Sequence, residues 1–312
     1  MTTPSPVHGP YPRVYLVRHG TTEWSQNGRH TGLTDIPLLP SGIEQAKLLS
    51  ERIFENPFQD MVHIDNISLV LVSPLQRAQQ TYQQLLQGGL SKEQREGTSQ
   101  HHSSCFTRTQ ARTTSLLTEW DYGDYEGITT KEILKSRPTW SLFGDNAPGG
   151  ETVEQVSARA DAIIELIHNF QRGQNSDGKK TNTLRMPFSG PEIVNAAASA
   201  ETLRQSEHTI QENRDNNQRH HDHANNVQPT IDKAVVTIPD NPTTRDVLVV
   251  AHGHFLRVFA ARWLRLDGIQ GKNFVLDTAS VSVLGYEHTL EERVIKVWNQ
   301  SNHLWKDNTR IG

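Results

Sequence analysis

The sequence predicts an α/β protein built on an open, mostly parallel sheet with helices on both faces. Short continuous apolar runs at residues 14–17, 68–72 and 247–251 are typical of strands buried on both faces. An apolar pattern with helical spacing follows each run, as in strand-then-helix units. Each run also ends in a polar cluster, and ligands of such sheets bind beyond the carboxyl ends of the strands.

The predicted elements follow one another with clear start signals. Capping patterns open three helices, namely Ser41 with Glu44, Ser73 with Pro74 and Gln76, and Thr152 with Gln155. The second of these places Arg77 in the first turn of its helix. A further helix is predicted over residues 255–264, and SVSVLGY and RVIKVW near the end alternate like antiparallel strands at a sheet edge.

Length and composition indicate one domain with polar insertions. The 312 residues suit one core, and hydrophobic residues make up only 34%, so part of the chain is too polar to pack. We expect a flexible leader over residues 1–12, which hold four prolines, and a single domain over residues 13–312.

Two stretches account for the part of the chain that is too polar to pack. Residues 88–112 are rich in Gly, Ser, Gln and His and are expected to form a surface excursion. Residues 171–244 are expected to be a mostly disordered insert, since they show no apolar periodicity. Its three clustered histidines are best explained as part of a solvated polar tract and receive no chemical role: His220, His221 and His223.

The charge balance excludes several classes of protein. Against 31 Lys and Arg stand 35 Asp and Glu, and the net charge of −4 argues against a general nucleic-acid binder or a polybasic membrane surface. Cys105 is the only cysteine, which excludes an intrachain disulfide and a cysteine-based zinc site. With no secretion signal and no run of 18 apolar residues, we expect a cytosolic protein, the nucleus remaining open.

Basic residues follow three of the predicted strands. Arg18 and His19 come after the first strand, Arg77 after the second, and His252 and His254 after the last. Because the carboxyl ends of parallel strands meet at one edge of a sheet, these side chains should converge on one crevice. Two guanidinium groups and a helix N-terminus suit a tetrahedral oxyanion, so we expect a phosphoryl group there.

One of the histidines is a candidate nucleophile, since an imidazole nitrogen can attack phosphorus and form a phosphohistidine that water later cleaves. The sequence has no GxxxxGK[ST] loop and no clustered aspartates for two metal ions. It also lacks the CxxxxxR loop of a cysteine phosphatase, Cys105 lying in a polar stretch. We therefore expect catalysis without a metal ion or another cofactor.

The stretch LLTEWDYGDYEG at residues 116–127 supplies a proton donor for the leaving group. Glu119 is the best candidate, because Leu117 and Trp120 would partly shield it from water and a nearby phosphate would favour its protonated form. Once it has lost its proton, the same carboxylate can activate the water.

Each motif alone has a plainer explanation. RHG is common as a turn with a solvated arginine, and a lone His252 is more often a core histidine than a catalyst. Asp124 and Glu126 are equally explained as turn caps, and Tyr122 and Tyr125 as packing residues. Coincidence is nevertheless a poor explanation, because RHG, SPLQRA and AHGH all follow buried strands in one chain.

Together these segments resemble the histidine phosphatase superfamily, the phosphoglycerate mutase-like proteins. The resemblance covers most of the chain outside the polar stretches and rests on VYLVRHGTTEWSQNGRHTGLTDIPLLPSGIEQA, VLVSPLQRAQQT, LTEWDYGDYEG, GGETVEQVSAR and VLVVAHGHFLR. Within the superfamily, the RHG and EWDYG segments are most similar to those of fungal sedoheptulose 1,7-bisphosphatases and their close relatives.

The resemblance implies roles for particular residues. His19 would be the phosphorylated nucleophile and Glu119 the proton donor, while Arg18, Arg77 and His252 would form the phosphate pocket. We further expect substrate contacts from Ser25, Thr31, Gly32, Tyr122, Gly253 and His254.

Some positions depart from the superfamily pattern. Ser25 stands where many members have asparagine, which would weaken a hydrogen bond to phosphate, although a serine still donates. The absence of a WRRS-like segment favours hydrolysis over mutase activity. A second phosphate would need further cations, for which a surface role is an equal explanation: Arg29, His30, His254 and Arg257.

We therefore expect a metal-independent phosphatase acting on a small phosphorylated sugar or sugar bisphosphate, with sedoheptulose 1,7-bisphosphate as the first choice. The alternatives are phosphoryl transfer of the phosphoglycerate mutase type, and a non-catalytic protein that binds a phosphometabolite or a phosphoprotein. The sequence leaves open whether the chain forms a homo-oligomer.

Overall fold

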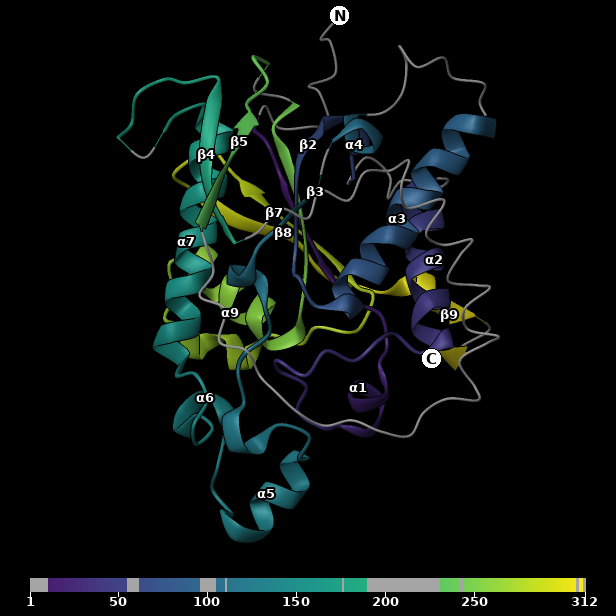
Figure 1. Cartoon of the computed structure of the whole chain (residues 1–312), viewed down its shortest axis with the longest axis vertical. Coiled ribbons are helices and arrows are strands. Elements are labelled where there is room, and N and C mark those ends of the chain that lie inside the picture. Colours follow the sequence, from purple (N-terminus) through teal and green to yellow (C-terminus); the bar gives the residue numbers. More distant parts are fainter. Residues whose placement is uncertain are drawn as a thin grey trace, which may run out of the picture.

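The computed structural model describes residues 11–54, 62–95, 105–109, 111–175, 177–189, 231–241, 244–306 and 309–310. Its centre is a six-stranded sheet in the order β3-β2-β6-β1-β7-β8 (Figure 1). The strands are β1 (Val14–Arg18), β2 (Ile67–Val72), β3 (Ala111–Thr113), β6 (Asp246–Ala251), β7 (Val281–Tyr286) and β8 (Arg293–Gln300). The predicted α/β class and mostly parallel sheet are confirmed.

Pairing within the sheet aligns the ends of the strands that matter for function. Strands β3, β2, β6 and β1 run parallel, while β7 is antiparallel to β1 and β8 to β7. Arg18 lies opposite Ala251, and Val72 opposite Val250. The residues that follow β1, β2 and β6 therefore leave the sheet at one edge.

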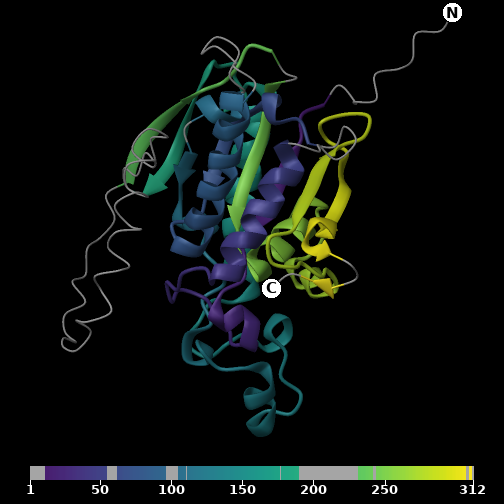
Figure 2. The same cartoon turned by 90° about the vertical axis from the view of Figure 1, so that its right-hand side faces the viewer.

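Helices cover both faces of the sheet, as Figures 1 and 2 show. The longer ones are α2 (Pro40–Phe54), α3 (Gln76–Arg95), α7 (Val153–Arg172) and α9 (Gly253–Trp263). Leu16 and Val249 face a core with α7 and α9, whereas their neighbours Val17 and Val250 face a core with α2 and α3. Alternate strand residues thus bury apolar surface on opposite faces, which is why these runs are apolar throughout.

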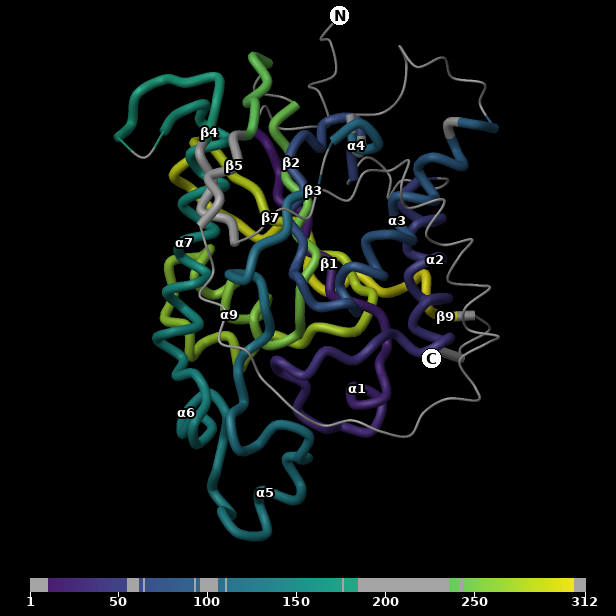
Figure 3. The backbone as a smooth tube through the Cα atoms, viewed as in Figure 1, coloured from purple at the N-terminus to yellow at the C-terminus, as the bar shows by residue number. Residues whose placement is uncertain are grey.

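A smaller part of the chain lies beyond the carboxyl ends of the parallel strands. It contains α1 (Glu23–Asn27), α5 (Thr130–Ser136) and α6 (Leu142–Asp145), which lie at the same end of the molecule in Figures 1, 2 and 3. His30 N donates to Ile128 O at 3.0 Å, so the segment after α1 is tied to the segment before α5. Short 3₁₀ helices complete the described chain: η1 (Ile64–Asn66), η2 (Ser115–Leu117), η3 (Gly123–Tyr125), η5 (Gly268–Asn273) and η6 (Asn302–Leu304).

Helix starts agree with the capping signals in part. The box of Thr152 and Gln155 opens α7 as predicted. Helix α2 begins at Pro40, so Ser41 is inside the helix rather than its cap. Helix α3 begins at Gln76, which places Arg77 in its first turn as predicted, and the Ser73 hydroxyl before it accepts from Leu75 N at 3.3 Å.

The prediction of a surface excursion over residues 88–112 was wrong for most of its described part. Helix α3 continues to Arg95, and α4 (Cys105–Arg108) and β3 follow. Phe106 is buried, with its ring 5.6 Å from that of Phe54, so apolar packing overrides the polar composition around it. Residues 96–104 and 110 lie outside the described residues.

The prediction of disorder over residues 171–244 was likewise wrong at both of its flanks. Helix α7 runs to Arg172, and β4 (Thr183–Ser189) pairs antiparallel with β5 (Ile231–Thr237). Leu184 and Val236 join the core beside α7, which supplies the burial that local periodicity did not reveal. Residues 190–230 with their three histidines, and residues 1–10 of the expected leader, lie outside the described residues.

The remaining described strands, β9 (Trp305–Lys306) and β10 (Thr309–Arg310), form a short pair of their own. None of the helices within the described ranges has the length and apolar character that crossing a membrane requires.

Candidate active site

His19 lies directly after β1, buried at the sheet edge. Its Nδ1 is 2.7 Å from Gly20 O, and a carbonyl can only accept, so Nδ1 carries the proton and Nε2 keeps a free lone pair. Burial first, and then the charges of Arg77 and Arg18, lower the pKa of His19 well below its usual value. The ring is therefore neutral and has the tautomer that a nucleophile needs.

His252 faces His19 from the end of β6, with ring centroids 5.2 Å apart. Arg77 Nε donates to His252 Nδ1 at 3.2 Å, so His252 Nε2 carries the proton and donates to Ser73 Oγ at 2.7 Å. The ends of β1, β2 and β6 thus meet at this point, as the sequence predicted.

The guanidinium group of Arg77 is fully buried and directed mainly at backbone oxygens. Nη1 donates to Thr34 O at 2.9 Å, and Nη2 to Gly32 O at 2.7 Å. Thr31 O is a further acceptor at 3.3 Å. Arg77 therefore anchors the loop of residues 31–34 beside the histidine pair, in addition to any contact with phosphate.

Glu126 holds the same loop from its other side. Its carboxylate accepts from Gly32 N at 2.9 Å and from Thr34 N at 3.0 Å. A Cβ on Gly32 would lie 2.5 Å from Trp120 O, so only glycine fits there. The predicted contact residues Thr31 and Gly32 thus enter the site through a loop whose carbonyls bind Arg77 and whose amides bind Glu126.

Arg18 is placed by the start of α9 and by the loop before β7. Nη1 of Arg18 donates to Leu276 O at 2.5 Å. A Cβ on Gly253 would lie 3.1 Å from Arg18 Cζ, so Gly253 gives the guanidinium the room that a side chain would fill. Arg18 thereby lies close enough to His19 to lower its pKa.

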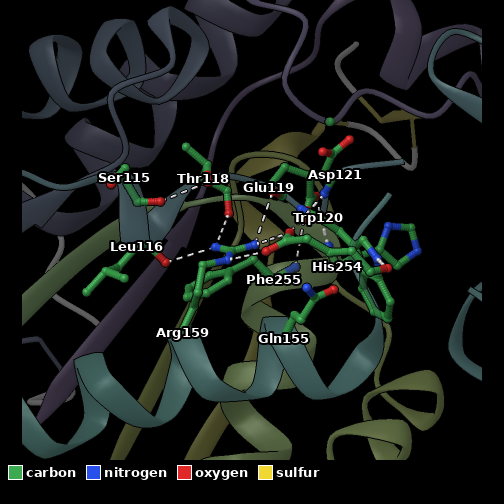
Figure 4. Close-up of polar contacts among 12 residues, drawn as sticks. Ser115, Leu116, Thr118, Glu119, Trp120, Asp121, Gln155, Arg159, His254 and Phe255 are labelled. Carbon is green, nitrogen blue, oxygen red and sulfur yellow. Dashed lines mark hydrogen bonds and ion pairs between the residues drawn. The ribbon is translucent and has the colours of Figure 1, made fainter. Parts of the chain in front are cut away.

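Glu119 is buried at the N-terminus of α9. Its Oε2 accepts from His254 N at 3.0 Å, and its Oε1 accepts from Phe255 N at 2.8 Å and Trp120 N at 2.9 Å (Figure 4). The N-cap residue His252 makes no side-chain cap, so a glutamate from a distant loop fulfils that function. Glu119 is shielded from water as expected, and its carboxyl oxygens accept three backbone hydrogen bonds.

Two histidines and a tyrosine pack together beside Glu119: His254, His30 and Tyr122. Tyr122 is buried, and its hydroxyl lies 2.6 Å from His254 Nδ1. The ring of His30 is 4.8 Å from that of Tyr122. Burial first, then Arg257, His30 and Arg18, lower the pKa of His254, which therefore serves as a neutral hydrogen-bonding group.

Ser25 has local contacts in the structure. Its hydroxyl donates to Thr22 O at 3.0 Å and accepts from Thr22 N at 2.8 Å in a capping box at the start of α1. Contact between Ser25 and phosphate stays a prediction.

Sequence reasoning left three functional candidates without a role. Glu126 was explained only as a turn cap, and Glu151 and Arg159 received none, although both belong to the segment GGETVEQVSAR. That segment carried a usable signal, because Glu151 precedes the helix start predicted at Thr152 and Arg159 follows it. Among the described residues, no three His, Cys, Asp or Glu side chains gather closely enough to hold a metal ion.

Comparisons with known proteins agree with this geometry. A protein-family model described as the histidine phosphatase superfamily (branch 1) matches residues 14–176 and 192–301. A sedoheptulose 1,7-bisphosphatase of Saccharomyces cerevisiae is 37% identical over 182 residues, which are 55% of this chain and 62% of the yeast protein. The match therefore spans less than two thirds of that relative.

Two matches from Mycobacterium tuberculosis extend over a longer range. An acid phosphatase of Mycobacterium tuberculosis is 27% identical over 283 residues, covering 91% of this chain and 91% of its own. The solved structure of an open reading frame from the same organism has a TM-score of 0.55 at 27% identity, covering 93% of this chain and 97% of that one.

Proposed function

Because the chain belongs to the histidine phosphatase superfamily, we propose that it hydrolyses phosphate monoesters through a phosphohistidine on His19, without a metal ion. The observation that carries the proposal is the bond from His19 Nδ1 to Gly20 O, which leaves Nε2 free beside Arg18 and His252. The buried Glu119, whose carboxylate binds the N-terminus of α9 from a loop, supplies the proton.

The first step forms a bond between His19 Nε2 and phosphorus and breaks the bond from phosphorus to the ester oxygen. That oxygen leaves with the bonding pair and takes a proton from Glu119. Glu119 therefore enters this step as the acid. Arg18 and His252 surround the point at which the negative charge is transferred.

The second step returns the enzyme to its starting state. Water attacks the phosphorus of the phosphohistidine and gives its proton to the Glu119 carboxylate, while the bond between nitrogen and phosphorus breaks with the pair returning to Nε2. Inorganic phosphate leaves, and His19 and Glu119 regain their initial proton states.

The substrate that best suits the site is a sugar bisphosphate. Arg257 donates from Nε to Gly271 O at 3.0 Å, lies 5.0 Å above the Phe143 ring, and is near enough to His254 to lower its pKa. Arg257 is therefore a candidate cation for a second phosphate beside His254. Arg29, by contrast, is exposed and donates to Gly127 O at 2.7 Å. The yeast sedoheptulose 1,7-bisphosphatase at 37% identity supports the same choice.

Trapping of the intermediate tests the mechanism. Labelled substrate quenched in alkali should leave acid-labile, alkali-stable phosphate on the protein, and His19→Ala should abolish both this label and phosphate release. Unlabelled protein with no turnover on any phosphate ester would instead support the binding-protein alternative. Transfer of the label to a second hydroxyl rather than water would support a mutase.

The second subsite has its own test. Arg257→Met should raise KM for sedoheptulose 1,7-bisphosphate at least about tenfold, while KM for a simple aryl phosphate changes little. Equal effects on both substrates would show that Arg257 does not hold a second phosphate.

A further inference from the structure

Arg159 on α7 forms hydrogen bonds with the loop that carries Glu119. Arg159 Nη1 donates to Leu116 O at 3.0 Å and to Thr118 O at 2.9 Å, and Nη2 reaches Glu119 O at 3.3 Å. Figure 4 shows the Arg159 side chain reaching from its helix to these carbonyls. One guanidinium therefore fixes the backbone immediately before the carboxylate and at it.

Glu151 binds Arg159 and the residues that follow Glu119. It receives Arg159 Nε and Nη2 in a bidentate pair, at 2.8 Å and 2.7 Å. Glu151 Oε2 also accepts from Asp121 N at 3.0 Å, and Glu151 O accepts from Trp120 Nε1 at 2.8 Å. The ion pair thus binds the chain on both sides of Glu119.

Phe255 links this pair to the other partner of the carboxylate. The Arg159 guanidinium carbon lies 5.1 Å from the Phe255 ring centroid, and Phe255 N donates to Glu119 Oε1. The helix end that receives the carboxylate therefore packs against the arginine that holds its backbone. The pair is largely buried, since 15% of the Arg159 side chain and 22% of the Glu151 side chain are exposed.

We infer that Arg159, fixed by Glu151, is a positioning residue that sets the Glu119 carboxyl for proton transfer to the leaving oxygen. The inference rests on the proposed phosphatase function. Residues 118–122 form no regular helix or strand, so side-chain contacts must define where Glu119 lies. A misplacement of about 1 Å in a catalytic group can cost about a hundredfold in rate.

The test compares leaving groups. With a phosphate ester of a sugar or alkyl alcohol, whose oxygen needs a proton to leave, Arg159→Met should lower kcat/KM by about 10–100-fold. With 2,4-dinitrophenyl phosphate, whose leaving group needs no proton, the loss should stay below about threefold. The ratio kcat/KM is the proper measure, because it reports steps up to formation of the phosphoenzyme and excludes its hydrolysis.

Arg262→Met is the matched control. Arg262 also forms a bidentate pair between α9 and α7, with Asp161 at 2.9 Å through both Nε and Nη2, but its only other side-chain bond among the described residues is to Leu266 O. Its variant should lose thermal stability without any dependence on the leaving group. Arg159→Lys and Glu151→Gln serve if Arg159→Met does not fold, and both should show the same dependence with a smaller loss.

The Glu119→Gln variant distinguishes failure of the positioning role from failure of the proposed phosphatase function. If Glu119→Gln is selective for poor leaving groups and the Arg159 and Glu151 variants are not, the positioning role is wrong and the acid role stands. If Glu119→Gln itself slows all leaving groups equally, the acid role and the inference fail together. Combining Arg159→Met with Glu119→Gln should add little to the loss of Glu119→Gln alone, because both act on one proton transfer.

Discussion

Individual side chains in this site orient one another, and Arg77 is the clearest case. A guanidinium has five N–H groups, and Arg77 uses most of them on His252 Nδ1 and on the carbonyls of residues 31, 32 and 34. The sequence indicated two basic residues facing phosphate. The structure shows that one of them first orients the histidine and the loop that line the pocket.

The protonation of His19 also follows from its surroundings. Burial and two nearby guanidinium groups all disfavour a positive imidazole, and the Gly20 carbonyl selects the tautomer. His19 is thus held neutral, which an isolated histidine with a pKa near 6.5 would not be in mild acid.

This state of His19 can be measured by NMR titration of the imidazole signals. As the pH falls from about 8 to about 5.5, the His19 ring should stay neutral, because its pKa is lowered. Exposed His288, whose pKa the nearby Glu292 raises, should become protonated in the same range and serves as internal control. A His19→Gln spectrum assigns the signal, and a His19 midpoint near 6.5 would contradict the expectation.

At the scale of elements, the loop of residues 31–34 is shaped from two sides. Arg77 binds its carbonyls and Glu126 its amides, and Gly32 packs against Trp120 O with no room for a methyl group. The loop has no regular structure of its own. Its conformation therefore depends on a charged side chain on each face.

Gly32→Ala tests this dependence. A Cβ there would lie 2.5 Å from Trp120 O and 2.7 Å from Glu126 Oε2, so the loop must shift and Arg77 must follow it. We expect kcat/KM to fall at least about tenfold while the protein still folds. Gly178→Ala, in a distant turn at φ 78° with nothing within 4 Å of the added carbon, should cost stability and leave kinetics unchanged. Unchanged kinetics in Gly32→Ala would show that the loop position is not critical.

On the scale of the whole molecule, a buried carboxyl group joins two strands at the end of the sheet opposite the site. Asp246 accepts from Arg13 N at 2.7 Å and from the Tyr15 hydroxyl at 3.0 Å, which links β6 to β1. Burial raises the pKa of Asp246 to about 7. The group is therefore mostly protonated in the folded protein at mildly acidic pH, where the unfolded chain has already lost that proton.

The contribution of Asp246 to the free energy of unfolding should therefore fall as the pH rises from about 4 to about 7. In this window the folded state binds one more proton than the unfolded state, so the free energy of unfolding decreases with pH. Asp246→Asn removes the titration, and its stability relative to the original protein should rise by a few kcal/mol, on the order of 1.4 per pH unit, across the window. Urea unfolding of both proteins at several pH values measures the difference. A difference that does not change with pH would contradict the assignment.

The sequence by itself determined the fold class, the strands β1, β2, β6, β7 and β8, and the meeting of His19, Arg18, Arg77 and His252. Local apolar runs predicted buried strands in a mostly parallel sheet, and the carboxyl ends of parallel strands share one edge. The order of the strands came from the structure. Glu119 was predicted from a different signal, the acidic and aromatic residues next to it in the chain, and its role as proton donor stays a prediction.

Only the tertiary structure decided how these groups are held. Glu119 binds the N-terminus of α9, and Arg159 with Glu151 binds the loop that carries it. Phe106 and the β4–β5 pair are likewise held by packing. All of these contacts join residues far apart in the chain. Local composition carries no information about such partners, because the energy of a buried hydrogen bond or an apolar contact depends on which distant surface arrives there.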